Sequence, residues 1–129
     1  PLLQAYCSNS DRRLVSLEKD LEWITPFHHL PHRNQIIQHV ESYTDVVGKA
    51  MSEMPWSVCF IDPSDEMDRM NVFKLALPAC QFVVVHDYHR GVEEKIGPLL
   101  NGVKHYVYRK YEPPTLIASV KRDPKVLFV

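Results

Sequence analysis

The sequence predicts an α/β fold: a mostly parallel sheet with helices on both faces and an antiparallel strand pair near the C-terminus. Apolar runs of strand length alternate with stretches of helical periodicity, which is typical of βαβ units. The last two strand-like runs instead flank Pro113 and Pro114 with no helix between them, so we expect them to pair antiparallel. A chain of 129 residues suits a single domain with a buried core.

The predicted elements of the first half alternate regularly. They are a strand at 14–17 closed by Glu18, a helix at 19–27, a strand at 35–42 and a helix at 44–54. Pro26 weakens the end of the first helix, because proline removes a backbone donor. Apolar side chains at helical spacing, among them Val47 and Met51, make the second helix amphipathic.

The second half continues the pattern. Its predicted elements are a strand at 56–62, a helix capped by Ser64 and ending near Leu77, a strand at 82–85, a helix at 92–100, and strands at 105–111 and 115–123. Asn101 and Gly102 form an ordinary helix-stop pair. A short apolar segment at 126–129 ends the sequence.

Composition excludes several classes of protein. Apolar residues make up 45% and charged residues 24%, and the formal charge of −1 gives no general attraction to nucleic acid or to an acidic membrane. No apolar run reaches the roughly 18 residues of a membrane span, and no secretory signal opens the sequence. The three cysteines are widely spaced, which favours reduced thiols. We therefore expect a soluble intracellular, cytoplasmic protein without a nucleic-acid or membrane partner.

Acidic or imidazole side chains close four successive predicted strands. Glu18 closes the first, Glu41 the second, Asp62 the third, and His86 with Asp87 the fourth. The carboxyl ends of parallel strands meet at one edge of a sheet, where ligands bind. Each residue alone also fits a plainer interpretation, as the first solvated residue after a strand or as a helix cap.

These strand ends suggest three kinds of chemistry. An acid such as Glu18 can accept hydrogen bonds from ribose hydroxyls in a nucleotide-binding sheet. Asp62 and Asp87 could hold Mg²⁺, which takes few protein carboxylates and keeps several waters. His86 or His89 could act as a general base near neutral pH.

The histidines of "FHHLPH" raise a separate metal hypothesis. His28, His29 and His32 lie on a proline-interrupted loop without a nearby cysteine. Adjacent histidines on such a loop rarely converge on one ion, so a solvated loop is the favoured interpretation.

Three segments together resemble the class I, S-adenosylmethionine-dependent methyltransferases. They are "LVSLEKDLEW" (14–23), "WSVCFIDPSDEMDR" (56–69) and "QFVVVHDY" (81–88). The resemblance implies a Rossmann-like sheet and S-adenosylmethionine as cofactor, with Glu18 on its ribose. It also implies Asp62 near the transferred methyl group, and Asp87 as a metal ligand as in several O-methyltransferases that act on small molecules.

The sequence departs from this family at its beginning. The family's first strand and glycine-rich loop should precede Glu18, yet none of the four glycines does, and the first residue is Pro1. In this fold the first strand lies between the second and the fourth, so its loss would leave backbone groups unpaired. We expect "KVLFV" (125–129), strand exchange or a homo-oligomer to fill the place.

Two functions from different classes follow. The first is S-adenosylmethionine-dependent methyl transfer to a small-molecule hydroxyl, with Glu18 and Asp62 on the cofactor and His86, Asp87 or His89 in catalysis. The second is a catalytically inactive methyltransferase-like fold that serves as a structural or protein-interaction module. A hydrolase or P-loop protein is disfavoured, because neither Gly-x-Ser-x-Gly nor a phosphate-binding glycine loop occurs.

Overall fold

A computed structural model describes residues 2–27 and 35–128. The chain divides into two compact units, Pro1–Tyr43 and Thr44–Val129, and we describe each by itself. His28, His29 and His32 lie outside the described residues.

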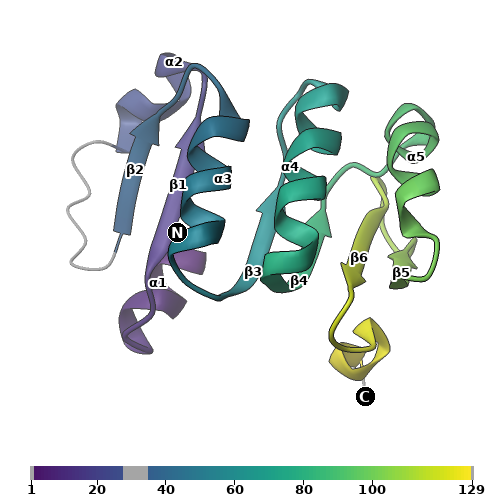
Figure 1. The fold of residues 1–129 in the computed structure, drawn as a ribbon. Helices are drawn as coiled ribbons and strands as arrows, with labels where there is room; N and C mark the ends of the chain where they lie inside the picture. The colour runs from purple at the N-terminus through teal and green to yellow at the C-terminus, as the bar shows by residue number, and fades with distance from the viewer. Residues whose placement is uncertain (1, 28–34, 129) are drawn as a thin grey trace. The chain divides into compact units, whose positions relative to one another are not determined.

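The first unit contains a parallel pair of strands, β1 (Leu14–Glu18) and β2 (Gln35–His39). Helix α1 (Leu2–Asn9) precedes β1, and α2 (Leu21–Ile24) with the 3-10 turn η1 (Thr25–Phe27) follows it (Figure 1). The register pairs Leu14 with Gln35 and Glu18 with His39. These two strands run parallel, in agreement with the predicted βαβ pattern.

The second unit contains a mixed four-stranded sheet in the order β3-β4-β6-β5. Its strands are β3 (Trp56–Ile61), β4 (Cys80–Val85), β5 (Lys104–Tyr108) and β6 (Thr115–Ser119). Its helices are α3 (Tyr43–Glu53), which begins at the last residue of the first unit, α4 (Glu66–Ala79) and α5 (Arg90–Ile96), with 3-10 turns η2 (Gly97–Leu100) and η3 (Pro124–Phe128).

The α/β class is confirmed, whereas a single, mostly parallel sheet is not. The described strands form two sheets, and each has one parallel pairing, β1 with β2 and β3 with β4. Strand β6 runs antiparallel to both β4 and β5, which confirms the predicted C-terminal pair. The apolar β6 buries Leu116 and Ala118 completely and takes an inner position, while β5 exposes Lys104 and His105 at the edge.

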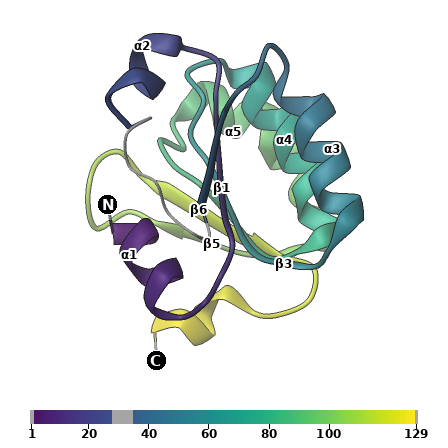
Figure 2. The same ribbon diagram turned by 90° about the vertical axis from the view of Figure 1, so that its left-hand side faces the viewer.

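Most fully buried strand residues of the second unit lie on one face of its sheet. Helices α3, α4 and α5 all lie on the same side of it (Figure 2). Ile61, Val83 and Val85 are at most 1% exposed, and so are Phe73 of α4 and Val92 of α5. The alternate β3 residues, Val58 and Phe60, are each 52% exposed, as expected when successive side chains of a strand point to opposite faces. Among the described residues of this unit, α-helices therefore cover one face only, whereas Phe128 of η3 contacts Tyr106 and Tyr108 on the opposite face.

Several boundaries differ from the prediction. Asp65, not Ser64, caps α4 by accepting from the Asp68 amide, and the helix runs two residues past Leu77 to Ala79. Residues 124–128 form a 3-10 turn rather than a strand, with Phe128 against Tyr106 and Tyr108 of β5. The expectation that "KVLFV" fills a place in the sheet is therefore wrong for its described residues. Gly102 does take the positive φ, 73°, of the predicted stop.

No helix among the described residues is long and apolar enough to cross a membrane.

Candidate functional site

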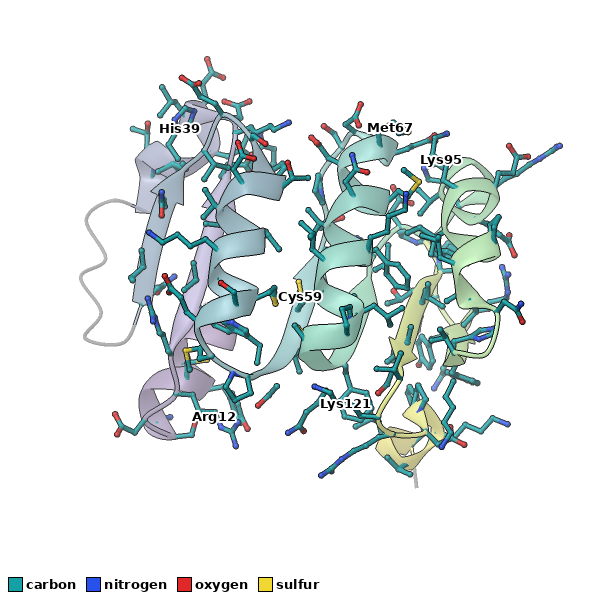
Figure 3. All side chains as sticks on the ribbon, in the orientation of Figure 1. Arg12, His39, Cys59, Met67, Lys95 and Lys121 are labelled. Atoms are coloured by element: carbon teal, nitrogen blue, oxygen red, sulfur yellow. The ribbon has the colours of Figure 1, made fainter. Side chains whose placement is uncertain are left out.

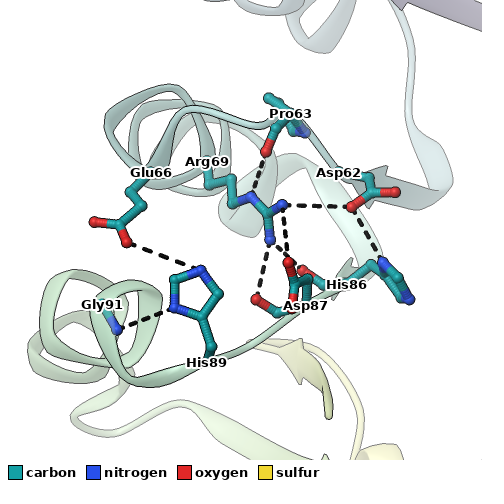
Figure 4. Close-up of polar contacts among 8 residues, drawn as sticks. All are labelled: Asp62, Pro63, Glu66, Arg69, His86, Asp87, His89 and Gly91. Carbon is teal, nitrogen blue, oxygen red and sulfur yellow. Dashed lines mark hydrogen bonds and ion pairs between the residues drawn. The ribbon is translucent and has the colours of Figure 1, made fainter. Parts of the chain in front are cut away.

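The ends of β3 and β4 bring three of the predicted site residues together. The two strands are parallel neighbours, and Ile61 pairs with Val85, so the next residues, Asp62 and His86, emerge side by side. His86 Nδ1 lies 3.1 Å from Asp62 Oδ1 (Figure 4). Asp87 follows directly in the chain. The expectation that these strand ends share one edge is met for β3 and β4.

The contact with Asp62 decides how the His86 ring is protonated. An ionised carboxylate only accepts hydrogen bonds, so Nδ1 of His86 must carry a proton and donate it. Nε2 of the neutral ring then carries the lone pair. The side chain is 39% exposed and stacks near the Phe60 ring, with centroids 6.1 Å apart. This arrangement gives an oriented base beside an exposed aromatic surface.

A buried arginine from α4 anchors the turn that carries His86. The Arg69 side chain is 5% exposed, and its guanidinium donates to the backbone carbonyls of Pro63, His86 and Asp87. Its Nη2 also lies 3.5 Å from Asp62 Oδ1 and 3.8 Å from Asp87 Oδ2. Both predicted metal-binding carboxylates therefore face a fixed positive charge.

The backbone conformation of Asp87 directs the carbonyls to this arginine. Asp87 has φ of 55°, in the left-handed region that aspartate tolerates better than most residues. The next amide, of buried Tyr88, donates to Pro114 O at 2.8 Å and ties the turn to the start of β6. Because the phenol is buried, the pKa of Tyr88 is raised above its usual value of 10.0. The contacts of Arg69 and the hydrogen bond from Tyr88 to Pro114 thus together fix the conformation of the residues that follow β4.

His89 has a different task from His86. Its Nδ1 accepts a hydrogen bond from the Gly91 amide at 3.1 Å, which makes His89 the N-cap of α5. The proton of the neutral ring must then be on Nε2, which lies 3.8 Å from Glu66 Oε1. With one nitrogen accepting and the other protonated, His89 has no free lone pair. We therefore assign it to capping rather than to proton abstraction.

Glu66 links α4 to α5 next to this cap. Its Oε2 lies 2.6 Å from Lys95 Nζ, and this hydrogen bond lowers the pKa of Glu66 and raises that of Lys95. A Cβ atom at position 91 would overlap the Glu66 carboxylate in its present position, so a larger residue there would displace this side chain. Glu66, an acid in the predicted acidic first turn of α4, is thus paired with Lys95 of α5.

Glu18 belongs to the first unit, at the end of β1. Its Oε1 accepts from the amides of Lys19 and Asp20, at 2.8 Å and 3.0 Å, and from the hydroxyl of buried Tyr43 at 3.3 Å. All its described contacts fall on Oε1. The other carboxylate oxygen therefore remains as a hydrogen-bond acceptor.

Arg69 and Tyr43 are the two site residues that the sequence did not indicate. A signal for Arg69 does exist: a cation in the first turns of a helix opposes the helix dipole, and so needs acidic partners. The preceding strand end supplies one in Asp62. For Tyr43 no comparable signal is present, since its role depends on a contact with a residue 25 positions away.

No group of three or more His, Cys, Asp or Glu side chains among residues 2–27 and 35–128 is arranged to hold a metal ion. Magnesium binding by Asp62 and Asp87, which takes only two carboxylates, stays a prediction. No protein-family model matches the chain, and neither does any curated protein. The functional argument therefore rests on the geometry of the strand ends.

Proposed function

We propose that the chain is a methyltransferase-like domain that methylates the hydroxyl of a small molecule, with His86 as general base. The observation that carries the proposal is the His86–Asp62 pair, 3.1 Å between Nδ1 and Oδ1, which leaves Nε2 as an oriented acceptor. S-adenosylmethionine, when bound, supplies an electrophilic methyl group. The proton of the acceptor hydroxyl would pass to His86 Nε2 as its oxygen bonds to the methyl carbon and the methyl–sulfur bond breaks, with S-adenosylhomocysteine as the leaving group.

The other site residues have supporting roles in this proposal. Asp62 is a positioning residue that fixes the tautomer and direction of the His86 ring, as the carboxylate of a hydrolase triad does. Arg69 and Asp87 hold the turn. Glu18 accepts a ribose hydroxyl on the oxygen that Tyr43 and the turn amides leave available.

Within each unit the strand pairing is in keeping with the proposal. Strands β1 and β3 each pair in parallel with the strand that follows in sequence, as expected for βαβ units.

Magnesium would compete with Arg69 for the same carboxylates. The guanidinium already supplies a positive charge 3.5 Å and 3.8 Å from Asp62 and Asp87, so a divalent ion would meet a buried cation. If magnesium does stabilise the protein, Asp87→Asn should abolish that stabilisation. A magnesium effect that survives the substitution would exclude Asp87 as a ligand.

The second function, an inactive interaction module, is favoured by the exposed apolar side chains beside the site. Val58 and Phe60 are each 52% exposed on edge strand β3, and such surfaces often mark contact sites. In that case Arg69 and the acids would serve stability alone.

Calorimetric titration of S-adenosylmethionine into the purified protein separates the two functions. We expect binding to the wild type and at least tenfold weaker binding to Glu18→Gln, since a hydrogen bond to a charged group contributes about 1.5–3 kcal/mol. Glu22→Gln, an exposed acid of the same unit, is the matched control and should bind as the wild type does. His86→Gln should bind cofactor normally but lose transfer to any hydroxyl acceptor. If no binding is detected at about millimolar cofactor, the binding free energy is weaker than about −4 kcal/mol. That result would reject the enzyme function and favour the interaction module.

A further inference from the structure

Three sulfur atoms meet in the second unit, away from the site of His86. They come from Met51 in α3, Cys59 in β3 and Cys80, which follows α4 and begins β4. Met51 Sδ lies 3.6 Å from Cys80 Sγ, and the thiols of Cys59 and Cys80 are hydrogen-bonded to each other. Cys80 is fully buried, whereas Cys59 and Met51 are half-buried; Figure 3 shows Cys59 beside α4. The cluster joins a helix, a strand and a helix end.

The two thiols differ in acidity although they are neighbours. The hydrogen bond with Cys80 raises the pKa of Cys59, and burial raises it further. The same hydrogen bond lowers the pKa of Cys80, burial raises it, and the charge of Lys121, whose Nζ donates to Ala79 O at 3.0 Å, lowers it.

We propose that Met51 Sδ, Cys59 Sγ and Cys80 Sγ form a binding site for a soft monovalent cation of the Cu(I) class. Two sulfurs bound to one ion through bonds of about 2.3 Å at a tetrahedral angle lie about 3.8 Å apart. The observed separation of 3.6 Å between Met51 Sδ and Cys80 Sγ is close to this value. Little movement of the two side chains is needed for both to reach one ion.

Ligand type selects the ion. A thioether is a soft, neutral ligand that suits Cu(I), whereas structural zinc sites use thiolates, imidazoles and carboxylates.

The test is an anaerobic Cu(I) titration of the whole chain against a chromophoric Cu(I) chelator. We expect the wild type to hold one equivalent that the double variant Cys59→Ser/Cys80→Ser does not hold. Met51→Leu conserves volume and should fold, yet should bind at least tenfold more weakly. Cys7→Ser, which alters the thiol of the first unit, is the control and should bind as the wild type does.

Three results would overturn the site. Equal affinity of Met51→Leu and the wild type would remove the thioether as a ligand. No difference between the wild type and the double serine variant would mean that the sulfurs only pack together. Zinc bound as tightly as Cu(I) would contradict the selectivity. Circular dichroism of each variant, and a Cu(I)-dependent rise in Tm seen in the wild type but not in Met51→Leu, separate loss of binding from loss of fold.

Discussion

Two histidines three residues apart are held with their protons on opposite nitrogens. Asp62, a pure acceptor, fixes the proton of His86 on Nδ1, whereas the Gly91 amide, a pure donor, fixes that of His89 on Nε2. The sequence "HDYH" gives no sign of this difference, because tautomers are set by partners that come from other elements. The two imidazoles therefore have different chemistry although their residue type and neighbourhood are alike.

Nitrogen NMR tests this assignment directly. In ¹⁵N-labelled protein at about pH 8, where an unperturbed imidazole is neutral, we expect the Nδ1–H tautomer for His86 and the Nε2–H tautomer for His89. Asp62→Leu should return His86 to a mixture of tautomers and leave His89 unchanged. Finding both rings in the same tautomer would contradict the separation into base and cap.

Arg69 should be among the most costly side chains to remove. Its guanidinium satisfies three backbone carbonyls, and a hydrogen bond to a charged group contributes about 1.5–3 kcal/mol. The two carboxylates are 47% and 40% exposed, so their ion pairs add little. We expect Arg69→Met to lower the free energy of unfolding in urea by about 3–5 kcal/mol.

A second arginine is the matched control. Arg90 is 91% exposed and pairs with Glu94 one helical turn away. Arg90→Met should change the free energy of unfolding by less than about 0.5 kcal/mol. Equal effects of the two substitutions would show that Arg69 does not anchor the turn.

At the scale of elements, the helix ends were the least predictable part. Both Ser64 and Asp65 are good caps, and only the backbone decides that Asp65 takes the extended conformation, with φ −78° and ψ 126°. Helix α5 is capped by a histidine, a residue outside the usual set, so the predicted start at residue 92 was two residues late. Which residue caps a helix depends on the direction from which the chain enters the helix, and residue propensities carry no information about that direction.

The link between α4 and α5 should give the protein an acid-sensitive component of stability. The hydrogen bond from Lys95 holds the pKa of Glu66 below its usual value of 4.5. A carboxyl group whose pKa is lower in the folded state contributes stability above its unfolded pKa and loses it as the pH falls below that value. As the pH falls from about 5 to about 3, we expect the urea concentration at the unfolding midpoint to fall less steeply in Glu66→Gln than in the wild type.

The control for this measurement is Glu53→Gln, an exposed acid near the end of α3. It should leave the pH dependence close to that of the wild type. Identical slopes for Glu66→Gln and the wild type would remove the α4–α5 link as a source of acid sensitivity.

At the scale of the whole molecule, the strand and helix pattern was predictable and the strand pairing only in part. Alternation of short apolar runs and amphipathic segments located the six strands of the described residues, since burial imposes that period locally. The division into two sheets and the inner place of β6 depend on contacts between distant residues, which periodicity does not encode. Asp62 and His86 were identified because each directly follows an apolar strand in the sequence. The place of Arg69 beside them depends on contacts between distant residues, so it was not identified.

In the second unit, truncating a buried side chain on the helix-covered face of the sheet should lower the free energy of unfolding much more than truncating an exposed side chain on the opposite face. Val83 is 0% exposed, whereas Val58, on the neighbouring strand and the opposite face, is 52% exposed. We expect Val83→Ala to lower the free energy of unfolding by about 2 kcal/mol and Val58→Ala by less than about 0.5 kcal/mol. Equal losses in chemical denaturation would mean that the face of Val58 is covered in solution, as the interaction-module function requires.

The acceptors of Arg69 have a consequence for how the site responds to acid. Three of them are peptide carbonyls, which neither gain nor lose a proton across the range in which proteins stay folded. The contacts of Arg69 Nη2 with Asp62 and Asp87 are longer, 3.5 Å and 3.8 Å, and add to these three bonds. The backbone of the turn is therefore held mainly by acceptors that carry no titratable proton.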